Sequence, residues 1–442
     1  MTRFQIASGP EPGQSPVDQQ PDQGLLVERV HLRLLQEIDP SVLEREPSGD
    51  ARDSMEATVR SLVEEVGGAI YGKAKEAAVQ AVLDEVVGLG PIQGLMNDPT
   101  VSEVMVNAPD EVYFERDGVI KLSSVRFRDD AHILRIVDRI ISPLGRRIDE
   151  SSPYVDARLP DGSRVNIVIP PLTPRSPTIT IRKFRHDMYS VDDLIANETL
   201  SRPLAGFLKA CIQRRLSIVI SGGSGTGKTT LLNALSVYIP ENERIITVED
   251  PIELKLQQRH VIAMEARPAN LEGRNEVTQR DLVRNALRMR PDRIIVGEVR
   301  GPEAFDMLQA MNTGHDGSLT TVHANSTRDA LSRIENTVLM AGLDLPARSI
   351  REQMGSALDL VVQLGRFGDG HRRVVSVSEV TGMEGEIITM QELFRFEQDA
   401  VKEDGSVVGE IRRTGIVPSF ADMFAQSGIE FDWAPRPAGG WA

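Results

Sequence analysis

A glycine-rich stretch that ends in a lysine and two threonines is the part of the sequence best suited to chemistry. Its residues are Gly222, Gly223, Ser224, Gly225, Thr226, Gly227, Lys228, Thr229 and Thr230. The run 217–221 predicts a buried strand before the stretch and residues 231–235 predict a helix after it, as a P-loop requires. In a P-loop the backbone N–H groups and the helix N-terminus bind phosphate, while Lys228 adds a charge near the β/γ-phosphates and Thr229 holds Mg²⁺. We therefore predict a site for ATP and Mg²⁺.

Two carboxylates follow later predicted strands. Residues 244–248 predict a strand that ends in Glu249, and residues 292–296 predict another, whose apolar run 294–296 leads through Gly297 to Glu298. Open α/β sheets bind ligands at the carboxyl ends of their strands, so both acids are expected at the ligand edge. We predict that Glu249 polarises the attacking water and that Glu298, in the manner of a Walker B acid, contacts Mg²⁺. A solvated turn after a strand is the alternative for each.

Histidines and arginines lie around these segments. His315 and His323 are the histidines closest along the chain, and neither has metal-ligand spacing to another His or Cys, so we predict no zinc site. A structural role is the alternative for both. Arg280, Arg284 and Arg288 recur every four residues on a predicted helix, which is typical of a solvated face. In a ring of copies, such a stripe could also reach an acidic neighbour or its nucleotide.

The elements that must position these residues suggest several regions. The predicted fold class is α/β: a RecA-like P-loop ATPase domain, with an N-terminal α+β domain preceded by a helical region. The predicted boundaries are a disordered tail at 1–23, a helical region at 24–98, an α+β domain at 99–185, a linker at 186–200, the RecA-like domain at 201–415 and a C-terminal tail at 416–442.

Composition narrows the function classes. The chain has 442 residues and a net charge of −15, with 4% aromatic residues, which argues against a mainly electrostatic or stacking grip on nucleic acid. No run of 18 apolar residues occurs and residues 1–23 lack the apolar core of a secretory signal, so we expect no membrane-spanning helix. The single cysteine, Cys211, excludes an internal disulfide and is expected in the core.

With these segments the sequence resembles the secretion-superfamily ATPases of type II secretion, type IV secretion and type IV pili. It looks most like the CpaF-type ATPases of tight-adherence (Flp) pili. The likeness covers about residues 25–415 and is most specific over 290–301 and 306–317. The resemblance implies that Glu249 lies in the Asp box, Glu298 in the Walker B element and His323 in the His box near the γ-phosphate.

The family also places arginines of the N-terminal domain against the nucleotide. The matching segments are 156–166 and 180–184, which make Arg164 and Arg182 the candidates. Surface arginines on strands are the alternative. One cysteine cannot build the four-cysteine zinc insertion common in type II secretion ATPases, so the sequence departs from that branch of the family.

The resemblance implies a mechanochemical ATPase that acts as a homohexamer. It would work at the cytoplasmic face of the inner membrane and pass its motion to an integral-membrane platform protein that extracts pilin. Membrane association would be peripheral, through partners only, and no nucleic acid would be bound. A type IV secretion ATPase is the nearest alternative, and a nucleic-acid translocase and a nucleotide-binding scaffold without turnover are alternatives of other classes.

Overall fold

The structure of the protein is a computed structural model. It describes residues 26, 29–30, 33–34, 50–67, 71–116, 118–184, 189–269, 274–426 and 431. The chain folds as two compact units, Met1–His186 and Asp187–Ala442, and each is described by itself. The predicted tail at 1–23 lies outside the described residues. None of the helices in the described segments has the length and apolar character needed to cross a membrane.

An antiparallel sheet forms the centre of the first unit. Over the described ranges it has six strands in the order β3-β2-β1-β6-β5-β4. Their bounds are β1 Val101–Ala108, β2 Glu111–Arg116, β3 Val119–Leu122, β4 Tyr154–Arg158, β5 Arg164–Val168 and β6 Thr178–Arg182. Buried and exposed residues alternate along β5 and β6, so one face packs on the core and the other is open.

Helix α6 (Asp130–Ile141) covers the packed face, where the sequence predicts a helix over 131–141. Asp129 caps it by accepting a hydrogen bond from the His132 N–H at 2.7 Å. The apolar residues Ile133, Ile136 and Ile140 recur at helical spacing and are buried against the sheet. The 3₁₀ helix η2 (Ser142–Leu144) follows α6 directly.

The helical region contributes α3 (Asp50–Gly67), α4 (Lys73–Val86), the 3₁₀ helix η1 (Gly90–Ile92) and α5 (Gln93–Asn97). Helices α3 and α4 share a small apolar core with Leu26, Val30 and Leu34. A buried pair joins α4 to α6, because an oxygen of Glu85 lies 2.9 Å from His132 Nε2. The helical region therefore packs on the α+β domain and belongs to the same unit.

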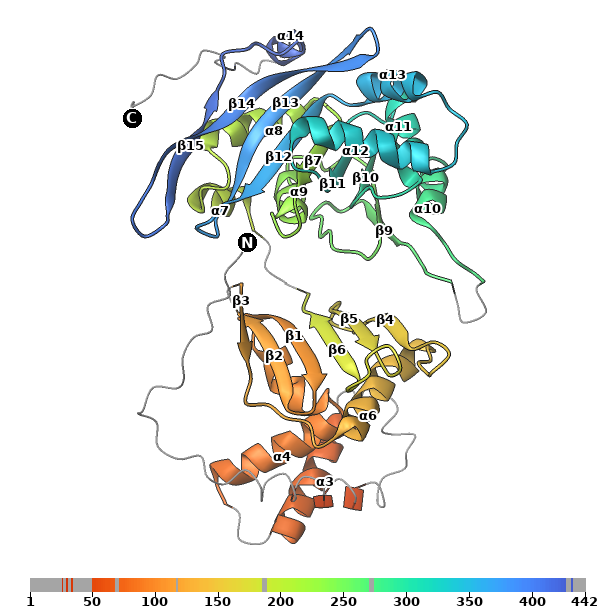
Figure 1. The fold of residues 1–442 in the computed structure, drawn as a ribbon, viewed down its shortest axis with the longest axis vertical. Helices are drawn as coiled ribbons and strands as arrows, with labels where there is room; N and C mark the ends of the chain where they lie inside the picture. Colours follow the sequence, from red (N-terminus) through yellow and green to blue (C-terminus); the bar gives the residue numbers. More distant parts are fainter. Residues whose placement is uncertain are drawn as a thin grey trace. The chain divides into compact units, whose positions relative to one another are not determined.

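The second unit is built on a larger sheet (Figure 1). Counted within the described residues it has nine strands in the order β15-β14-β13-β12-β7-β11-β10-β8-β9. The parallel strands are β7 Ile218–Gly222, β8 Ile245–Glu249, β9 Val261–Glu265, β10 Arg293–Val296, β11 Leu319–Val322 and β12 Leu360–Arg366. The antiparallel strands are β13 Arg372–Glu384, β14 Ile387–Val401 and β15 Val407–Arg413.

The order of the parallel strands defines the fold. Strand β7, which precedes the P-loop, is separated by β11 alone from β10, which precedes Glu298. This is the RecA-like order, and the α/β fold class predicted from the sequence is confirmed. Strands β7, β8, β10 and β11 are buried along their whole length, which explains the Ile and Val residues of β7, β8 and β10, while β11 also buries Thr320 and Thr321.

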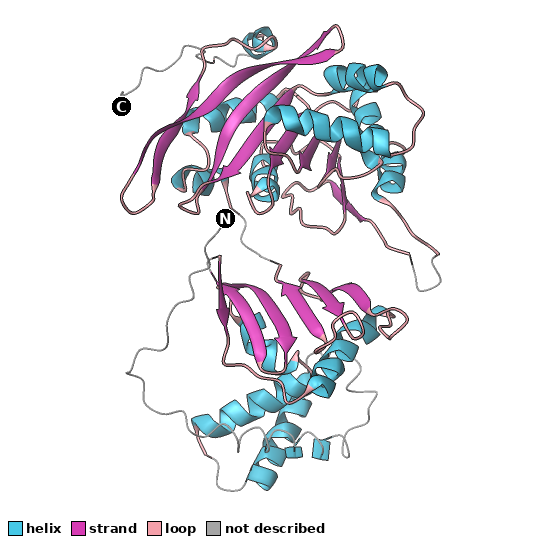
Figure 2. Ribbon diagram, in the orientation of Figure 1, coloured by secondary structure: helices cyan, strands magenta, loops and turns pink. Residues whose placement is uncertain are grey.

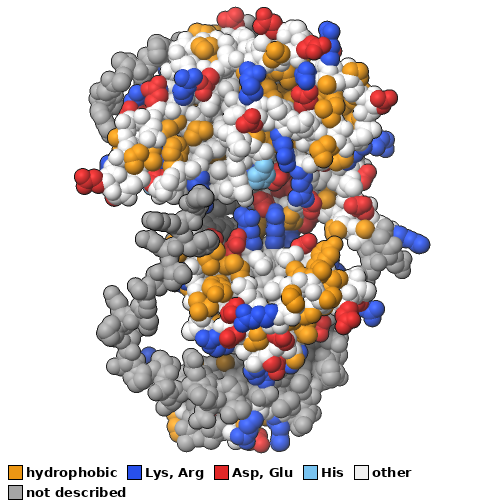
Figure 3. Space-filling model, viewed as in Figure 1, with side chains coloured by type: hydrophobic (Ala, Val, Ile, Leu, Met, Phe, Trp, Pro, Cys, Tyr) orange, Lys and Arg blue, Asp and Glu red, His pale blue; other side chains and the backbone are white. Residues whose placement is uncertain are grey.

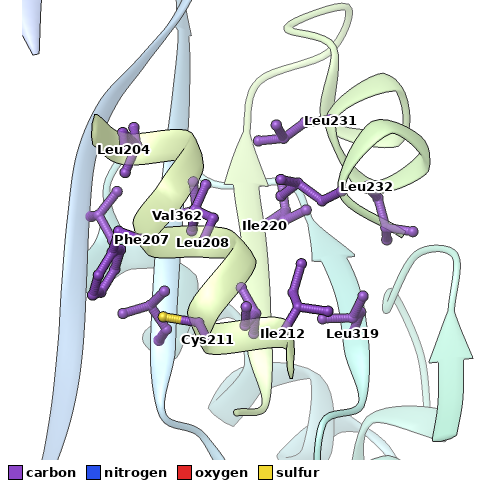
Figure 4. Packing of buried hydrophobic residues seen from close by; sticks show 14 of the residues in the cluster. Leu204, Phe207, Leu208, Cys211, Ile212, Ile220, Leu231, Leu232, Leu319 and Val362 are labelled. Atoms are coloured by element: carbon purple, nitrogen blue, oxygen red, sulfur yellow. The ribbon is translucent and has the colours of Figure 1, made fainter. Parts of the chain in front are cut away.

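Helices cover both faces of this sheet (Figure 2). One core contains residues of α7 (Val191–Ala196), α8 (Arg202–Gln213) and α9 (Lys228–Ser236). The other core contains residues of α10 (Gln279–Ala286), α11 (Glu303–Asn312), α12 (Thr327–Met340) and α13 (Ala347–Ala357). Figure 4 shows Cys211 on α8 among Phe207, Leu208 and Ile212, so the lone cysteine lies in the core as expected.

Two segments expected outside the ATPase domain are packed into it. Leu194 of α7 and Leu200, in the predicted linker 186–200, belong to the same core as α8. Within the predicted tail 416–442, α14 (Ala421–Ala425) buries Phe424, whose ring centroid lies 6.1 Å from that of Phe207. Both boundaries are corrected by this packing, which places residues 189–200 and 418–426 in the second unit.

Candidate functional site

The P-loop connects the end of β7 to the start of α9. Two of its glycines have backbone conformations that other residues rarely adopt, with φ of 70° at Gly225 and 91° at Gly227. A Cβ atom on Gly222 would lie 2.5 Å from Thr226 Oγ1, so this position also requires glycine. The loop therefore has the tight backbone turn that brings N–H groups and the N-terminus of α9 to one place.

Lys228 lies at the centre of the site. Its Nζ donates to the carbonyl oxygens of Gly222 at 3.1 Å and Gly223 at 3.0 Å. The same Nζ lies 3.3 Å from His323 Nδ1, and His323 Nε2 lies 3.5 Å from Glu298 Oε1. Burial lowers the pKa of Lys228, and the negative charges of Glu298 and Glu253 oppose that shift. Three predicted site residues thus meet although they come from different elements. Lys228 begins α9, His323 follows β11 and Glu298 follows β10.

Glu249 ends β8 and is 2% exposed. One carboxylate oxygen accepts hydrogen bonds from the N–H groups of Glu253 at 2.7 Å and Leu254 at 2.9 Å, and the other accepts from Thr247 Oγ1 at 3.2 Å. Burial raises the pKa of Glu249, while these hydrogen bonds counteract part of the rise. The arrangement holds a carboxylate of increased basicity in a fixed orientation.

Gly297 gives Glu249 its space. A Cβ atom at position 297 would lie 2.8 Å from Glu249 Cγ, closer than real Cβ contacts come. Gly297, which precedes Glu298, therefore leaves space for the side chain of Glu249 at the end of β8, and that side chain occupies the space beside the glycine.

Glu253 is a site residue that the sequence reasoning missed. Its carboxylate accepts a hydrogen bond from Thr229 Oγ1 at 3.2 Å, and Thr229 is the predicted Mg²⁺ ligand. The only sequence signal is its position four residues after Glu249 in the turn that follows β8. The oxygens of Thr229, Glu253 and Glu298 are ligands of the kind that Mg²⁺ prefers, so the donor set fits this metal.

The remaining predicted residues lie apart from this cluster. Arg280 Nε of α10 donates to Asp306 Oδ2 of α11 at 2.7 Å, and Arg284 Nε lies 3.9 Å from the same carboxylate. The arginine stripe therefore reaches an acidic neighbour within its own unit. His315 Nδ1 lies 3.3 Å from the carbonyl oxygen of Ala310, at the end of α11, where it helps to close the helix.

Arg164 and Arg182 belong to the first unit. They are directly paired across the antiparallel strands β5 and β6, and Arg158 of β4 is the partner of Arg164 on its other side. Arg182 Nε lies 3.7 Å from Glu103 Oε1 of β1, and its side chain is 61% exposed. Three arginines thus form a row across the open face of the six-stranded sheet.

Comparison with known proteins gives a family. The model of the family described as "Type II/IV secretion system protein" matches residues 85–414, which include all the site residues above. This chain belongs to that family. The match spans both units and every strand of the parallel sheet.

Two relatives illustrate the type II/IV secretion family. The type IV secretion system protein VirB11 of Brucella suis is 34% identical over 329 residues, covering 68% of this chain and 91% of the relative. The conjugal transfer protein TrbB of Rhizobium radiobacter is 31% identical over 311 residues, covering 69% of this chain and 91% of the relative. Both matches reach almost the whole length of the relative.

Solved structures of ATPases also match. A crystal structure of the pilus retraction motor PilT with bound ADP is 21% identical and covers 64% of this chain and 80% of that chain, with a TM-score of 0.48.

Proposed function

We propose that this chain is an ATPase that hydrolyses ATP to ADP and phosphate at the P-loop and converts the energy into motion within a secretion or pilus machine. The observation that carries the proposal is the meeting of Lys228, His323 and Glu298 at one edge of a RecA-like sheet, with Glu249 at the end of the next strand. Each role in hydrolysis has a residue of the right type.

In this proposal each residue of the site has a separate role, which follows from its position. The P-loop backbone binds the phosphates, Lys228 stabilises their charge and Thr229 holds the metal, with Glu298 on the same side. Mg²⁺ at these oxygens would neutralise charge on the β- and γ-phosphates. Glu249 orients the attacking water and accepts its proton, because burial raises the pKa of this acid toward the working pH. His323 would contact the γ-phosphate through the ring that lies beside Lys228.

Arg164 and Arg182 complete the proposed site. Their row on the open face of the first sheet offers guanidinium groups that suit phosphate oxygens. We propose that they stabilise charge in the transition state, as the family resemblance implies, and that six copies of the chain form the working ring. Specific ATPase activity that stays constant on dilution to the monomer would argue against the ring.

The finer proposal is assembly of a tight-adherence (Flp) pilus. It rests on the resemblance of residues 290–301 and 306–317 to the CpaF-type ATPases. The chain would act at the cytoplasmic face of the inner membrane and pull on a platform protein that extracts pilin. Acidic and basic side chains are both spread over the surface in Figure 3, which supports protein partners rather than nucleic acid.

Type IV secretion is a second candidate. It is supported by VirB11 and TrbB, whose sequences this chain matches over nine-tenths of their length. The P-loop geometry serves either machine equally, so the two candidates differ in what the motor drives and not in the chemistry.

Source cells carrying Lys228→Ala separate the two candidates. Electron microscopy would count surface filaments, secreted protein and conjugal DNA transfer would be measured in parallel, and a blot would check the protein level. Loss of thin pili with secretion and DNA transfer intact supports the pilus motor. Normal filaments with lost secretion or DNA transfer would reject it in favour of type IV secretion.

A further inference from the structure

A loop rich in arginine lies beside the P-loop. Strand β12 runs parallel to β7 and pairs Leu364 with Gly222, so both strands end at the same edge of the sheet. The chain turns from β12 into β13 through residues 367–371, and the segment 365–373, here named the arginine loop, comprises this turn and the strand ends that carry Arg366, Arg372 and Arg373. The loop is thus placed at the phosphate edge by the sheet itself.

The arginine loop is firmly anchored. Asp369 accepts hydrogen bonds from the N–H groups of His371 and Val407, both at 2.9 Å, and from Arg373 Nη1 at 3.2 Å. Arg373 is 3% exposed and its Nη2 also donates to Glu198 at 3.1 Å. These bonds, led by that of the Val407 N–H, hold the pKa of Asp369 well below its usual range. The loop therefore has a fixed conformation.

The fixed loop directs Arg372 to the P-loop. Side chains alternate along a strand, so Arg372 is on the opposite side from the buried Arg373 and is exposed. A Cβ atom placed on Gly227 would lie 3.6 Å from Arg372 Cδ, which puts the arginine stem against the last glycine of the P-loop. Arg366 is the direct partner of Arg372 across the β12–β13 pair.

This arrangement concentrates positive charge. Like charges directly opposite on paired strands destabilise a sheet. The N-terminus of α9 carries the positive end of the helix dipole, where cations are unfavourable, and Lys228 adds a further charge. A phosphate placed among these groups would meet several positive charges, and the planar guanidinium fork matches phosphate oxygens.

We propose that Arg372 and Arg366 bind the phosphates of the nucleotide that do not react, from the β12 side of the P-loop. The proposal rests on nucleotide binding at the P-loop, as put forward above. Glu249, Glu298 and His323 follow strands on the other side of β7, so the two arginines act on affinity and not on the chemical step. In this proposal the residues of hydrolysis lie on one side of the nucleotide, and Arg366 and Arg372 bind it from the other side.

The test compares four variants of the full chain: Arg372→Ala, Arg372→Lys, Arg366→Ala and the control Arg348→Ala. Arg348 lies in an exposed ion pair with Glu352 on α13, away from the P-loop. Calorimetry gives the Kd for Mg-ADP, phosphate release gives KM and kcat for ATP, and thermal unfolding checks the fold.

A lost hydrogen bond to a charged group predicts a rise of about tenfold or more in Kd and KM for Arg372→Ala. The rise in Kd and KM should be smaller for Arg366→Ala, partial for Arg372→Lys and absent for Arg348→Ala. Because the arginines are proposed to act on binding alone, kcat of every variant should stay within about threefold of wild type. Wild-type affinity in folded Arg372→Ala, or a fall in kcat with KM unchanged, would overturn the inference. Wild-type protein that binds no ADP would overturn the proposed function as well.

Discussion

Two pairs of arginines, one in each unit, share a local arrangement and differ in what surrounds them. Arg164 and Arg182 face each other across β5 and β6, and Arg366 and Arg372 face each other across β12 and β13. The first pair stands on an open sheet face, with a carboxylate of Glu103 near Arg182. The second lies where β12 ends beside β7, and the stem of Arg372 packs against Gly227 of the P-loop.

The difference separates two uses of the same residue type. An arginine fixed beside the P-loop can hold phosphates whenever nucleotide is present, so its removal should weaken binding. For Arg164 and Arg182 the proposed role is to stabilise charge in the transition state, so their removal should slow turnover. The pairs should therefore differ in which kinetic constant they change.

The largest effect is expected from the first pair. Arg164→Ala or Arg182→Ala should lower kcat by about 10³-fold or more, because arginines of this type stabilise transition-state charge. The Kd for Mg-ADP should stay near that of wild type. Steady-state phosphate release and calorimetry on the same preparations measure both constants.

Arg175→Ala is the matched control for these variants. Arg175 lies in the same unit, is 66% exposed and donates to Glu111 at 2.8 Å. It should leave kcat unchanged, since it lies in the connection between β5 and β6, at the opposite end of these strands from Arg164 and Arg182. Turnover at the wild-type rate in both Arg164→Ala and Arg182→Ala would show that these residues are ordinary surface arginines.

Glu249→Gln should have the next largest effect, because Gln keeps the shape but cannot accept the proton of water. We expect kcat to fall by about 10²- to 10⁴-fold with little change in ADP affinity. In wild type the activity should decline on acidification at a higher pH than for an ordinary carboxylate, since burial raises the pKa of Glu249. A pH–rate profile measures this.

Two further variants sharpen this prediction. Gly297→Ala would push against Glu249 Cγ and should lower kcat by up to about 10²-fold through displacement of the base. Glu265→Gln, at the position of β9 paired with Glu249, should turn over like wild type. Full activity in Gly297→Ala would mean that the exact position of Glu249 does not matter.

The smallest expected effect concerns stability. Burial raises the pKa of Asp359 from 3.8 to about 6, and the Ser217 N–H bonded to its carboxylate opposes the rise. The folded state then holds the proton more tightly than the unfolded chain, so the free energy of unfolding falls as pH rises from about 4 to 6 and is flat above. The loss corresponds to about 3 kcal/mol.

Asp359→Asn removes this titration while its side-chain oxygen can still accept the hydrogen bond from Ser217. The Tm of the variant relative to wild type should therefore be higher at pH 7.5 than at pH 5. Thermal unfolding at the two pH values measures the difference. An equal Tm difference at both values would show that Asp359 titrates normally.

The parts of the fold that the sequence predicted are those set by local pattern. The strand before the P-loop, the acids after β8 and β10 and the helix at 131–141 each follow from a short apolar run or helical spacing. The RecA-like domain follows because such runs alternate with helices. The motifs also predicted Lys228 and Glu298 at the phosphate site, the family resemblance added His323, and the structure brings the three side chains together.

The rest depends on pairings between distant segments. Glu253 contacts Thr229 only because the turn after β8 folds back toward α9. Arg366 and Arg372 reach the P-loop because β12 pairs with β7, more than 140 residues earlier in the chain. Phe424 is buried against Phe207, although its segment has the composition of a tail. No local pattern encodes these contacts, so they became visible only in the folded chain.

The central claim is that this P-loop turns over ATP, and phosphate release by the purified full chain with Mg-ATP tests it most directly. The account predicts release well above background by wild type and a loss of about 10³-fold in Lys228→Ala, whose phosphate-binding charge is gone. Wild-type release at background, with Mg-ADP still bound in calorimetry, would contradict the account and leave a nucleotide-binding scaffold in its place.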